Sequence, residues 1–181
     1  MTTDHQRIYF LHGLESSGNG TKGKFFANHF PDILRPDFKG SLSTRLRQLE
    51  SLCHEAENIT LIGSSFGGLM ASCFAESNRE RVSRLVLMAP ALNFENYTPP
   101  IRPIEIPTLV VIGEHDDVTP IDPVAGLAQA TFSNLTTWVS NDDHMLHNSF
   151  IQLNWKNLLD TGIDFCSLQP PPGVLKKIST L

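Results

Sequence analysis

The chain has 181 residues, 40% hydrophobic and 18% charged, a composition that supports one domain with a substantial core and excludes an intrinsically disordered chain. Its formal net charge of −5, without a run of Lys and Arg, argues against nucleic acid as the main partner. No apolar run is long enough to span a bilayer, so we expect no membrane partner.

In the first part of the chain, apolar runs alternate with helical patterns and loop-forming residues. Strands are predicted at residues 7–11, 33–35 and 58–64, and helices at residues 21–30 and 41–56. The first helix carries Phe25, Phe26 and Phe30 on one side, which favours core packing over a substrate pocket. The N-cap of the second helix is predicted to be Ser43 or Thr44.

The third predicted strand runs into the pentapeptide GSSFG at residues 63–67, and a helical pattern follows it. This is G-x-S-x-G in a strand–turn–helix context, the setting of a nucleophile elbow. Gly63 and Gly67 leave room where a Cβ would collide with the neighbouring strand or helix. The turn lifts the hydroxyl of Ser65 clear of the sheet, so Ser65 is the candidate nucleophile, whereas Ser64 is expected to be structural.

The second part of the chain repeats the alternation. The elbow helix is predicted to end near residue 78, further strands lie at 82–88, 108–113 and 135–139, and further helices at 122–131 and 149–159. The segment 91–107 contains four prolines and is expected to be irregular. Residues 1–161 are predicted to form the single domain, and residues 162–181 a loose C-terminal tail or a strap across the surface.

Strands that alternate with helices build a mostly parallel sheet covered on both faces, and the fold class is therefore α/β. We expect a three-layer α/β/α sandwich with about six strands. Ligands of such sheets bind beyond the carboxyl ends of the strands. The unusual clusters of this chain all follow strand ends: His12-Gly13, Ser65, Glu114–Asp117 and Asp142–His144.

A serine nucleophile needs a base, normally histidine, and a carboxylate that holds the base in one tautomer. The segment after the strand at 108–113 supplies carboxylates, and the segment after the strand at 135–139 supplies a histidine. Asp116 competes with Asp117 and Glu114 for the acidic role, and His144 competes with His147 for the basic one. The chain order Ser, Asp, His is the order of the α/β-hydrolase fold.

At these residues the sequence resembles the α/β-hydrolase superfamily over about residues 7–160. The run IYFLHGL at 8–14 is similar to the oxyanion loop of that superfamily, GEHDDVTP at 113–120 to its acid loop, and DDHML at 142–146 to its histidine loop. The opening LHGLESSGNGTKGK, together with GSSFGG, looks most like the small bacterial YqiA-type esterases, whose compact fold lacks a large cap.

The resemblance implies Ser65 as nucleophile, His144 as base and Asp116 as orienting acid. It also implies an oxyanion hole made by the backbone N–H groups of Leu14 and Phe66. Larger members of the superfamily insert a helical cap after the strand at 82–88, where this chain has only its short Pro-rich segment. An open active site without a cap is therefore expected.

The function predicted from these residues is that of a serine hydrolase, of carboxylesterase type, which cleaves small carboxylic esters or thioesters through an acyl-enzyme. One alternative is a non-catalytic binding or regulatory module on the same scaffold, and another is an amidase or peptidase. A metal cluster of Asp142, His144, His115 and Asp116 is a weaker alternative, and no metal or cofactor is expected. The side chain of His12 is expected to brace its loop.

Cys53, Cys73 and Cys166 are an odd number of cysteines without C-x-x-C spacing, which is typical of reduced thiols. The N-terminal residues lack the basic-then-apolar order of a secretory signal. Both observations favour a cytoplasmic protein. Its expected partner is a small-molecule ester or thioester, and the sequence makes no prediction of the oligomeric state.

Overall fold

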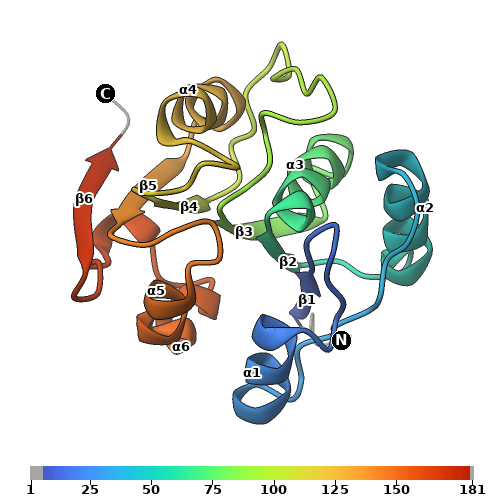
Figure 1. The fold of residues 1–181 in the computed structure, drawn as a ribbon. Coiled ribbons are helices and arrows are strands. Elements are labelled where there is room, and N and C mark those ends of the chain that lie inside the picture. The colour runs from blue at the N-terminus through green and yellow to red at the C-terminus, as the bar shows by residue number, and fades with distance from the viewer. Residues whose placement is uncertain (1–5, 180–181) are drawn as a thin grey trace.

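The computed structural model describes residues 6–179, and side chains as far as Val174 (Figure 1). Its centre is a six-stranded sheet in the order β1-β2-β3-β4-β5-β6. The first five strands are parallel and the sixth is antiparallel to β5. The strands are β1 (Arg7–Leu11), β2 (Ile59–Ser64), β3 (Val82–Met88), β4 (Thr108–Gly113), β5 (Leu135–Ser140) and β6 (Val174–Ser179).

Helices cover both faces of the sheet, which confirms the three-layer sandwich (Figure 1). One face carries α2 (Leu42–Cys53), α3 (Phe66–Ser77) and α4 (Ile121–Thr131), and the other carries α1 (Thr21–His29), α5 (His147–Gln152) and α6 (Trp155–Leu159). Because both faces are covered, the central strands are continuous apolar runs rather than alternating ones, and β4 is buried at every position.

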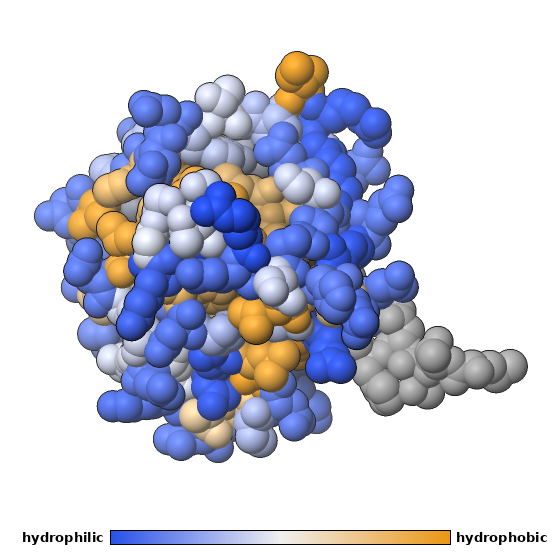
Figure 2. Space-filling model, turned by 90° about the vertical axis from the view of Figure 1, so that its right-hand side faces the viewer, coloured by the Kyte–Doolittle hydropathy of each residue, from blue (hydrophilic) through white to orange (hydrophobic). Residues whose placement is uncertain are grey.

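Two hydrophobic clusters fill the spaces between the layers. Leu49, Leu69 and Val124 represent the cluster under α2, α3 and α4. Phe26 and Phe150 represent the one under α1, α5 and α6. Hydrophilic residues dominate the exterior face shown in Figure 2, with apolar residues in small areas between them. Among the described residues, no helix has the length and apolar character needed to cross a membrane.

Three predicted elements differ from the structure. Residues 33–35 form no strand, because only one parallel bridge joins Leu34 to Tyr9 before Pro36 ends the extended segment. The cap of α2 is Ser41, whose Oγ accepts from the N–H of Thr44, so the predicted caps were wrong. The helix predicted at 149–159 is two short helices, α5 and α6, and Asn154 caps the second.

The segment 162–181 is not a loose tail where the structure describes it. It forms a short 3-10 helix, Phe165–Ser167, and then β6, which pairs with β5. Phe165 is buried and lies under the guanidinium of Arg84, whose Cζ is 3.6 Å from the ring centroid. The segment therefore extends the same sheet and helps to cover one of its faces.

The segment 91–107, by contrast, is irregular as predicted, with no helix or strand. It lies on one side of the molecule and is fixed by side chains of its neighbours. Arg79 donates to the carbonyls of Arg102 and Pro103, at 2.6 and 2.8 Å. Asn93 donates to the carbonyl of Val118, at 3.0 Å. The chain thus places no helical cap between β3 and β4.

Candidate active site

Ser65 occupies a strained turn between β2 and α3. Its backbone has φ 54° and ψ −118°, a conformation that residues with a Cβ rarely adopt. Backbone hydrogen bonds fix this turn from both sides. Its N–H donates to the carbonyl of Met88 at 2.9 Å, and its carbonyl accepts from Gly68 at 2.8 Å and from Ala91 at 3.0 Å. The turn therefore holds the side chain of Ser65 in one place above the strand ends.

The two glycines of the motif make this close packing possible. A Cβ on Gly67 would lie 2.0 Å from the carbonyl oxygen of Leu11, at the end of β1. A Cβ on Gly63 would lie 2.5 Å from the carbonyl oxygen of Gly67. Both obstacles are backbone atoms, which cannot move aside as a side chain can. The structure thus confirms the steric reason for glycine at these positions.

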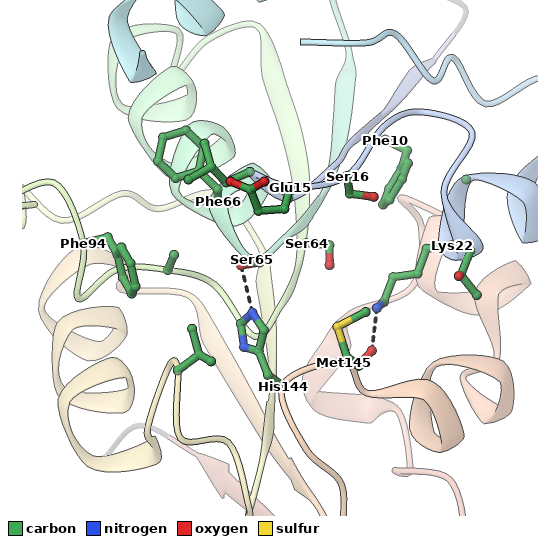
Figure 3. A pocket seen from close by; sticks show the side chains of 16 residues that line it. Phe10, Glu15, Ser16, Lys22, Ser64, Ser65, Phe66, Phe94, His144 and Met145 are labelled. Atoms are coloured by element: carbon green, nitrogen blue, oxygen red, sulfur yellow. Dashed lines mark hydrogen bonds between the residues drawn. The ribbon is translucent and has the colours of Figure 1, made fainter. Parts of the chain in front are cut away.

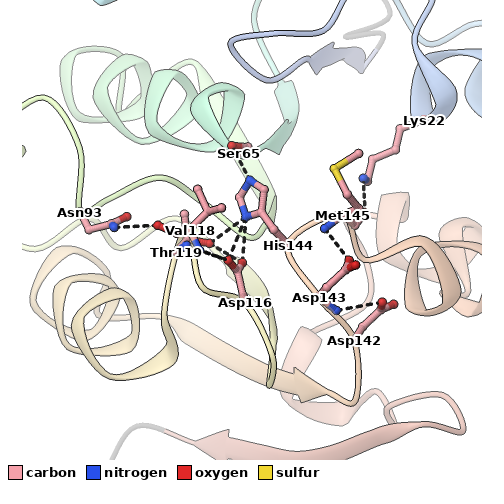
Figure 4. A network of polar contacts seen from close by, with 10 residues as sticks. All are labelled: Lys22, Ser65, Asn93, Asp116, Val118, Thr119, Asp142, Asp143, His144 and Met145. Carbon is pink, nitrogen blue, oxygen red and sulfur yellow. Dashed lines mark hydrogen bonds and ion pairs between the residues drawn. The ribbon is translucent and has the colours of Figure 1, made fainter.

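Ser65, His144 and Asp116 meet at the carboxyl ends of three parallel strands (Figure 4). The Nε2 of His144 is 2.9 Å from the Oγ of Ser65. The Nδ1 of the same ring is 2.9 and 3.1 Å from the two carboxylate oxygens of Asp116. The His144 side chain is 18% exposed, whereas that of Asp116 is fully buried. The imidazole thus bridges a hydroxyl and a carboxylate.

The carboxylate of Asp116 is held by the turn that follows it. Its Oδ1 accepts from the N–H groups of Val118 and Thr119, at 2.9 and 2.7 Å, and its Oδ2 accepts from the hydroxyl of Thr119 at 2.5 Å. Burial acts to raise the pKa of Asp116, but the hydrogen bonds from Thr119 and the contact with His144 outweigh it and hold the pKa below its usual value. The carboxylate is therefore ionised at neutral pH.

The rival residues of the two loops lie elsewhere. Glu114 and Asp117 are exposed, and no hydrogen bond in the described part of the chain joins either side chain to His144. His147 is exposed at the start of α5. His115 contacts Asn141 at 2.8 Å. Within residues 6–179, no group of three His, Cys, Asp or Glu side chains is arranged to hold a metal ion.

Asp142 fixes the loop that carries His144. Its Oδ2 accepts from the N–H groups of Asn148 and Ser149 and from the hydroxyl of Ser149, at 2.9 to 3.0 Å, and its Oδ1 accepts from the N–H of Asp143 at 3.0 Å. Burial acts to raise the pKa of Asp142, but these hydrogen bonds, chiefly those from Ser149, lower it overall. The sequence suggested Asp142 only as a metal ligand, and its actual partners lie up to seven residues away.

The loop after β1, which was predicted to carry an oxyanion donor, is braced by His12 and Arg45. The Nε2 of His12 accepts from the N–H of Phe38 at 2.9 Å, so its Nδ1 carries the proton and donates to the carbonyl of Gly13 at 2.7 Å. Burial lowers the pKa of His12, which suits this neutral form. Arg45 donates to the carbonyl of Leu14 at 3.2 Å. His12 therefore braces its loop as expected, whereas the part played by Arg45 was not predicted.

A pocket of about 390 Å³ opens at Ser65 (Figure 3). Leu14 and Phe66, the residues expected to supply the oxyanion hole, both belong to its lining. Four large apolar side chains of the lining are also 41–48% exposed, and they form an apolar rim around the mouth of the pocket: Leu14, Phe94, Val118 and Met145. Ser65 thus lies in an accessible depression with mainly apolar walls.

Comparison with known proteins identifies chains that share this fold. A family model described as "alpha/beta hydrolase fold" matches residues 39–100, the stretch from α2 to the segment after β3. Phytyl ester synthase 1 of Arabidopsis thaliana, a chloroplastic protein, is 32% identical over 123 residues. The match covers 61% of this chain and only 17% of that relative, so the chain spans about a sixth of its length.

Solved structures share the architecture at low sequence identity. Est1E from Butyrivibrio proteoclasticus, solved with ferulic acid, has a TM-score of 0.66 at 12% identity and covers 82% of this chain and 84% of its own. A thermophilic esterase from Thermogutta terrifontis has 0.62 at 16% identity, covering 78% and 84%. Mouse alpha/beta hydrolase domain-containing protein 10 has 0.64 at 16%, covering 80% and 84%. Likenesses at such identities show a common fold.

Proposed function

This chain has the α/β-hydrolase fold, and from that premise we propose that it is a serine hydrolase that cleaves small carboxylic esters or thioesters through an acyl-enzyme. The observation that carries the proposal is the continuous contact from the Ser65 hydroxyl through His144 to the buried carboxylate of Asp116. A histidine that is held by a carboxylate can accept the proton of a serine hydroxyl, and this activates an otherwise unreactive alcohol.

The distances suit a proton transfer in both directions. Because the Nδ1 of His144 faces the ionised Asp116, the proton of the neutral ring belongs on Nδ1 and leaves Nε2 free to accept. The Ser65 Oγ bonds to the acyl carbon as its proton passes to Nε2. The imidazolium then gives that proton to the departing alkoxide or thiolate. Water, deprotonated by the same Nε2, attacks the acyl-enzyme and releases the acid and Ser65.

We propose Leu14 and Phe66 as the residues whose N–H groups stabilise the negative oxygen of the tetrahedral intermediate. Two observations support this. Phe66 begins α3, where the first N–H groups have no acceptor within the helix. The loop of Leu14 is braced by His12 and Arg45, which limits how far its peptide groups move. Loss of one such donor typically costs about 3–4 kcal/mol of transition-state stabilisation.

The proposed substrate class follows from the walls of the pocket. A volume of about 390 Å³ with mainly apolar lining suits a small acyl or alcohol group, and no cap encloses a larger one. The names of the relatives are consistent with ester chemistry, since one is a phytyl ester synthase and another was solved with ferulic acid. An amidase shares the acyl-enzyme, and parallel assays with a 4-nitroanilide and a 4-nitrophenyl ester separate the two.

The proposal is tested with Ser65→Ala. Without the nucleophile, kcat on 4-nitrophenyl acetate and butyrate should fall by about a million-fold, and labelling by a fluorophosphonate should disappear. Ser77→Ala is the matched control, because Ser77 is exposed at the end of α3, and it should keep both activities. Equal hydrolysis by Ser65→Ala and the parent would refute the mechanism. A parent protein that reacts with neither reagent would favour the non-catalytic binding module.

We also propose that the protein acts in the cytoplasm on a small-molecule substrate. In the described part of the chain, Cys53 and Cys73 form no disulfide, as is usual in a reducing compartment. Burial raises the pKa of Cys53 and of Cys73 to about 11, so neither is the kind of thiol that serves as a nucleophile. Fractionation of cells that produce the protein, followed by immunodetection, tests the location.

A further inference from the structure

Lys22 places a buried cation in the wall of the active-site pocket. It lies in the first turn of α1, is 8% exposed, and belongs to the lining of the same pocket as Ser65. Its Nζ donates to the carbonyl of Met145 at 2.5 Å (Figure 3). An ammonium has three N–H groups, so this one carbonyl leaves two available.

The charge of Lys22 has no counter-ion in the described part of the chain, since no carboxylate there forms an ion pair with it. Asp142 and Asp143 act on it only from a distance, and the carboxylate of Asp142 already accepts bonds from α5. Burial lowers the pKa of Lys22 to about 8, so the group is still mainly protonated at pH 7. Its Nζ also lies 5.6 Å from the centroid of the Phe150 ring, but an aromatic ring carries no net negative charge. A desolvated cation without a counter-ion is costly, and an anion that enters the pocket would relieve that cost.

Further donors lie around Lys22. The hydroxyls of Ser16, Thr21 and Ser64 line the same pocket, and none has a hydrogen-bond partner among the side chains that the structure describes. The start of α1 also lines the pocket with Thr21, Lys22 and Gly23, and no side chain caps that helix. The free N–H groups and the partial positive charge of a helix start favour an anion as well.

The pocket is therefore divided into two chemically different halves. In Figure 3, Lys22 and Ser64 lie on one side of the Ser65–His144 pair, and Phe94 lies on the other. Val118 also belongs to the lining, and its carbonyl accepts from Asn93, which precedes Phe94 in the chain. Lys22 is the only lysine or arginine among the described residues of the lining. A substrate that spans Ser65 would meet Phe94 in one direction and a buried ammonium in the other. The lining also includes the carboxylate of Glu15, which is exposed to solvent, whereas Lys22 is buried.

We propose that the substrate of this site is an ester or thioester that carries a carboxylate, which Lys22 binds while Ser65 attacks the acyl carbon. The inference rests on the proposed function and adds the charge of the substrate to it. A carboxylate is favoured over a phosphate monoester because one ammonium balances one negative charge, whereas a phosphate carries nearly two. The hydroxyls of Ser16 and Ser64 supply neutral donors for its oxygens.

Lys22 has a rival, purely structural role. Its bond to Met145 joins α1 to the residue that follows His144, and loss of that bond alone would shift the imidazole. Such a shift would lower the hydrolysis of every ester by the same factor. The ratio of kcat/KM for a charged and a neutral ester therefore separates the two roles. Replacing Lys22 changes that ratio if Lys22 binds the substrate, and leaves it unchanged if Lys22 only supports the loop of His144.

The test compares mono-4-nitrophenyl glutarate with its neutral methyl ester, in the parent, Lys22→Met, Lys22→Arg and Lys24→Met. The parent should prefer the charged ester by about ten- to a hundredfold, the usual value of a charge-assisted hydrogen bond. Lys22→Met should lose the preference, and Lys22→Arg should retain part of it. Lys24→Met removes an exposed lysine of the same helix and should retain all of it.

In a second pair of esters the carboxylate is on the alcohol part of the substrate. The pair is 4-carboxyphenyl butyrate and its neutral methyl ester. The phosphate monoester of 4-hydroxyphenyl butyrate is tested as a third compound. Loss of preference in Lys22→Met for either carboxylate pair supports the proposal and tells which part carries the charge. Equal ratios in the parent and Lys22→Met for both pairs overturn it, as does a preference for the phosphate alone.

Calorimetric binding of monomethyl glutarate to Ser65→Ala and to Ser65→Ala/Lys22→Met separates this inference from the proposed function. Binding to the first protein at least tenfold tighter than to the second supports the subsite even if no ester is cleaved. A different result is cleavage of the esters with equal affinities of Ser65→Ala and Ser65→Ala/Lys22→Met and equal ester ratios of the parent and Lys22→Met. It would support the proposed hydrolase and overturn the carboxylate subsite.

Discussion

At the scale of single residues, Thr119 determines the state of Asp116. It donates to the carboxylate twice, through its N–H and its hydroxyl, and its Oγ1 also lies 3.2 Å from the Nδ1 of His144. Thr119 itself is fully buried, so water cannot replace the hydroxyl. Removal of that hydroxyl would therefore take one hydrogen-bond donor away from the carboxylate of Asp116 and make its ionised form less stable.

Thr119→Val should lower the free energy of unfolding by about 1.5–3 kcal/mol and kcat/KM by about tenfold, because a buried carboxylate loses a hydroxyl donor. The pKa of Asp116 should rise, and the acid limb of the pH profile of kcat/KM should move to higher pH. Thr119→Ser, which keeps the hydroxyl, should restore the profile. Urea unfolding and ester kinetics from pH 4 to 9 measure both effects, and an unmoved acid limb would contradict the role.

The two buried carboxylates predict how stability depends on pH. Asp116 and Asp142 both have a pKa below the usual value of 3.8 in the folded protein, because their hydrogen bonds outweigh burial. As the pH falls, the unfolded chain therefore binds protons at a higher pH than the folded chain does. The contribution of both carboxylates to the free energy of unfolding is complete above about pH 5, and it is lost as the pH falls through their pKa values in the folded protein. Urea midpoints from pH 7 to 3 should show this loss, with a shallower slope for Asp142→Asn. Equal slopes would refute it.

The sequence was sufficient for the residues of the site that belong to local motifs. The elbow, the acid loop and the histidine loop each have a recognisable spacing, and the structure brings Ser65, Asp116 and His144 into contact. The supporting residues have no such spacing. Lys22 meets Met145 across 123 positions of the chain and Arg45 meets Leu14 across 31, and only the packed fold determines these pairs.

At the scale of elements, the N-terminus of α2 shows how caps are selected. Ser43 and Thr44 were the predicted caps, but Ser41 has the same type of side chain, and propensity alone does not rank these residues. Ser41 has the extended backbone that a cap requires, with φ −65° and ψ 165°, and Gly40 before it has φ 91°. The left-handed glycine ends the preceding turn, so the helix begins one residue after Ser41.

Ser41→Ala should lower the free energy of unfolding by about 1 kcal/mol, the usual cost of a lost cap. Ser43→Ala should cost much less, because Ser43 lies inside the helix and accepts no backbone N–H. Thermal unfolding of both variants beside the parent measures the difference. A larger loss for Ser43→Ala than for Ser41→Ala would reverse the assignment.

The other element errors have physical causes as well. The pattern at 149–159 has helical apolar spacing, but the chain turns at Leu153, whose backbone is extended at ψ 134°, and Asn154 then caps a new helix. Residues 33–35 have the composition of a strand, but they pair with β1 at one position only. In both places tertiary packing overrides a local preference, and single-sequence patterns do not contain that information.

At the scale of the whole molecule, residues 162–179 complete the sheet. β6 pairs with β5 at five positions, and Phe165 packs under Arg84, which also donates to the carbonyl of Leu158 at 2.7 Å. The sequence suggested a tail because three prolines interrupt it and because its strand, VLKKIS, is short and half polar. Such an edge strand is recognised only by the neighbour with which it pairs. The predicted domain boundary near residue 161 stays a prediction.

Removal of residues 162–181 should destabilise the protein rather than leave it unchanged. The truncation bares the edge of β5 and part of the cluster that contains Phe165, so we expect a lower melting temperature and binding of the dye ANS. The full-length protein with Phe165→Ala is the comparison, and it should lose about 3–5 kcal/mol on its own. A truncated protein that melts with the parent would show that the segment is dispensable.

The irregular link from Ala91 to Pro107 has a consequence for the diversification of this scaffold. It leaves β3 beside Ser65, contributes Phe94 to the apolar rim, and crosses to the opposite edge of the sheet, where β4 begins. Residues inserted near Phe94 would extend over the substrate, and the strands would keep their register. Insertions in the connection between β3 and β4 would thus change the substrate selectivity without replacing Ser65, Asp116 or His144.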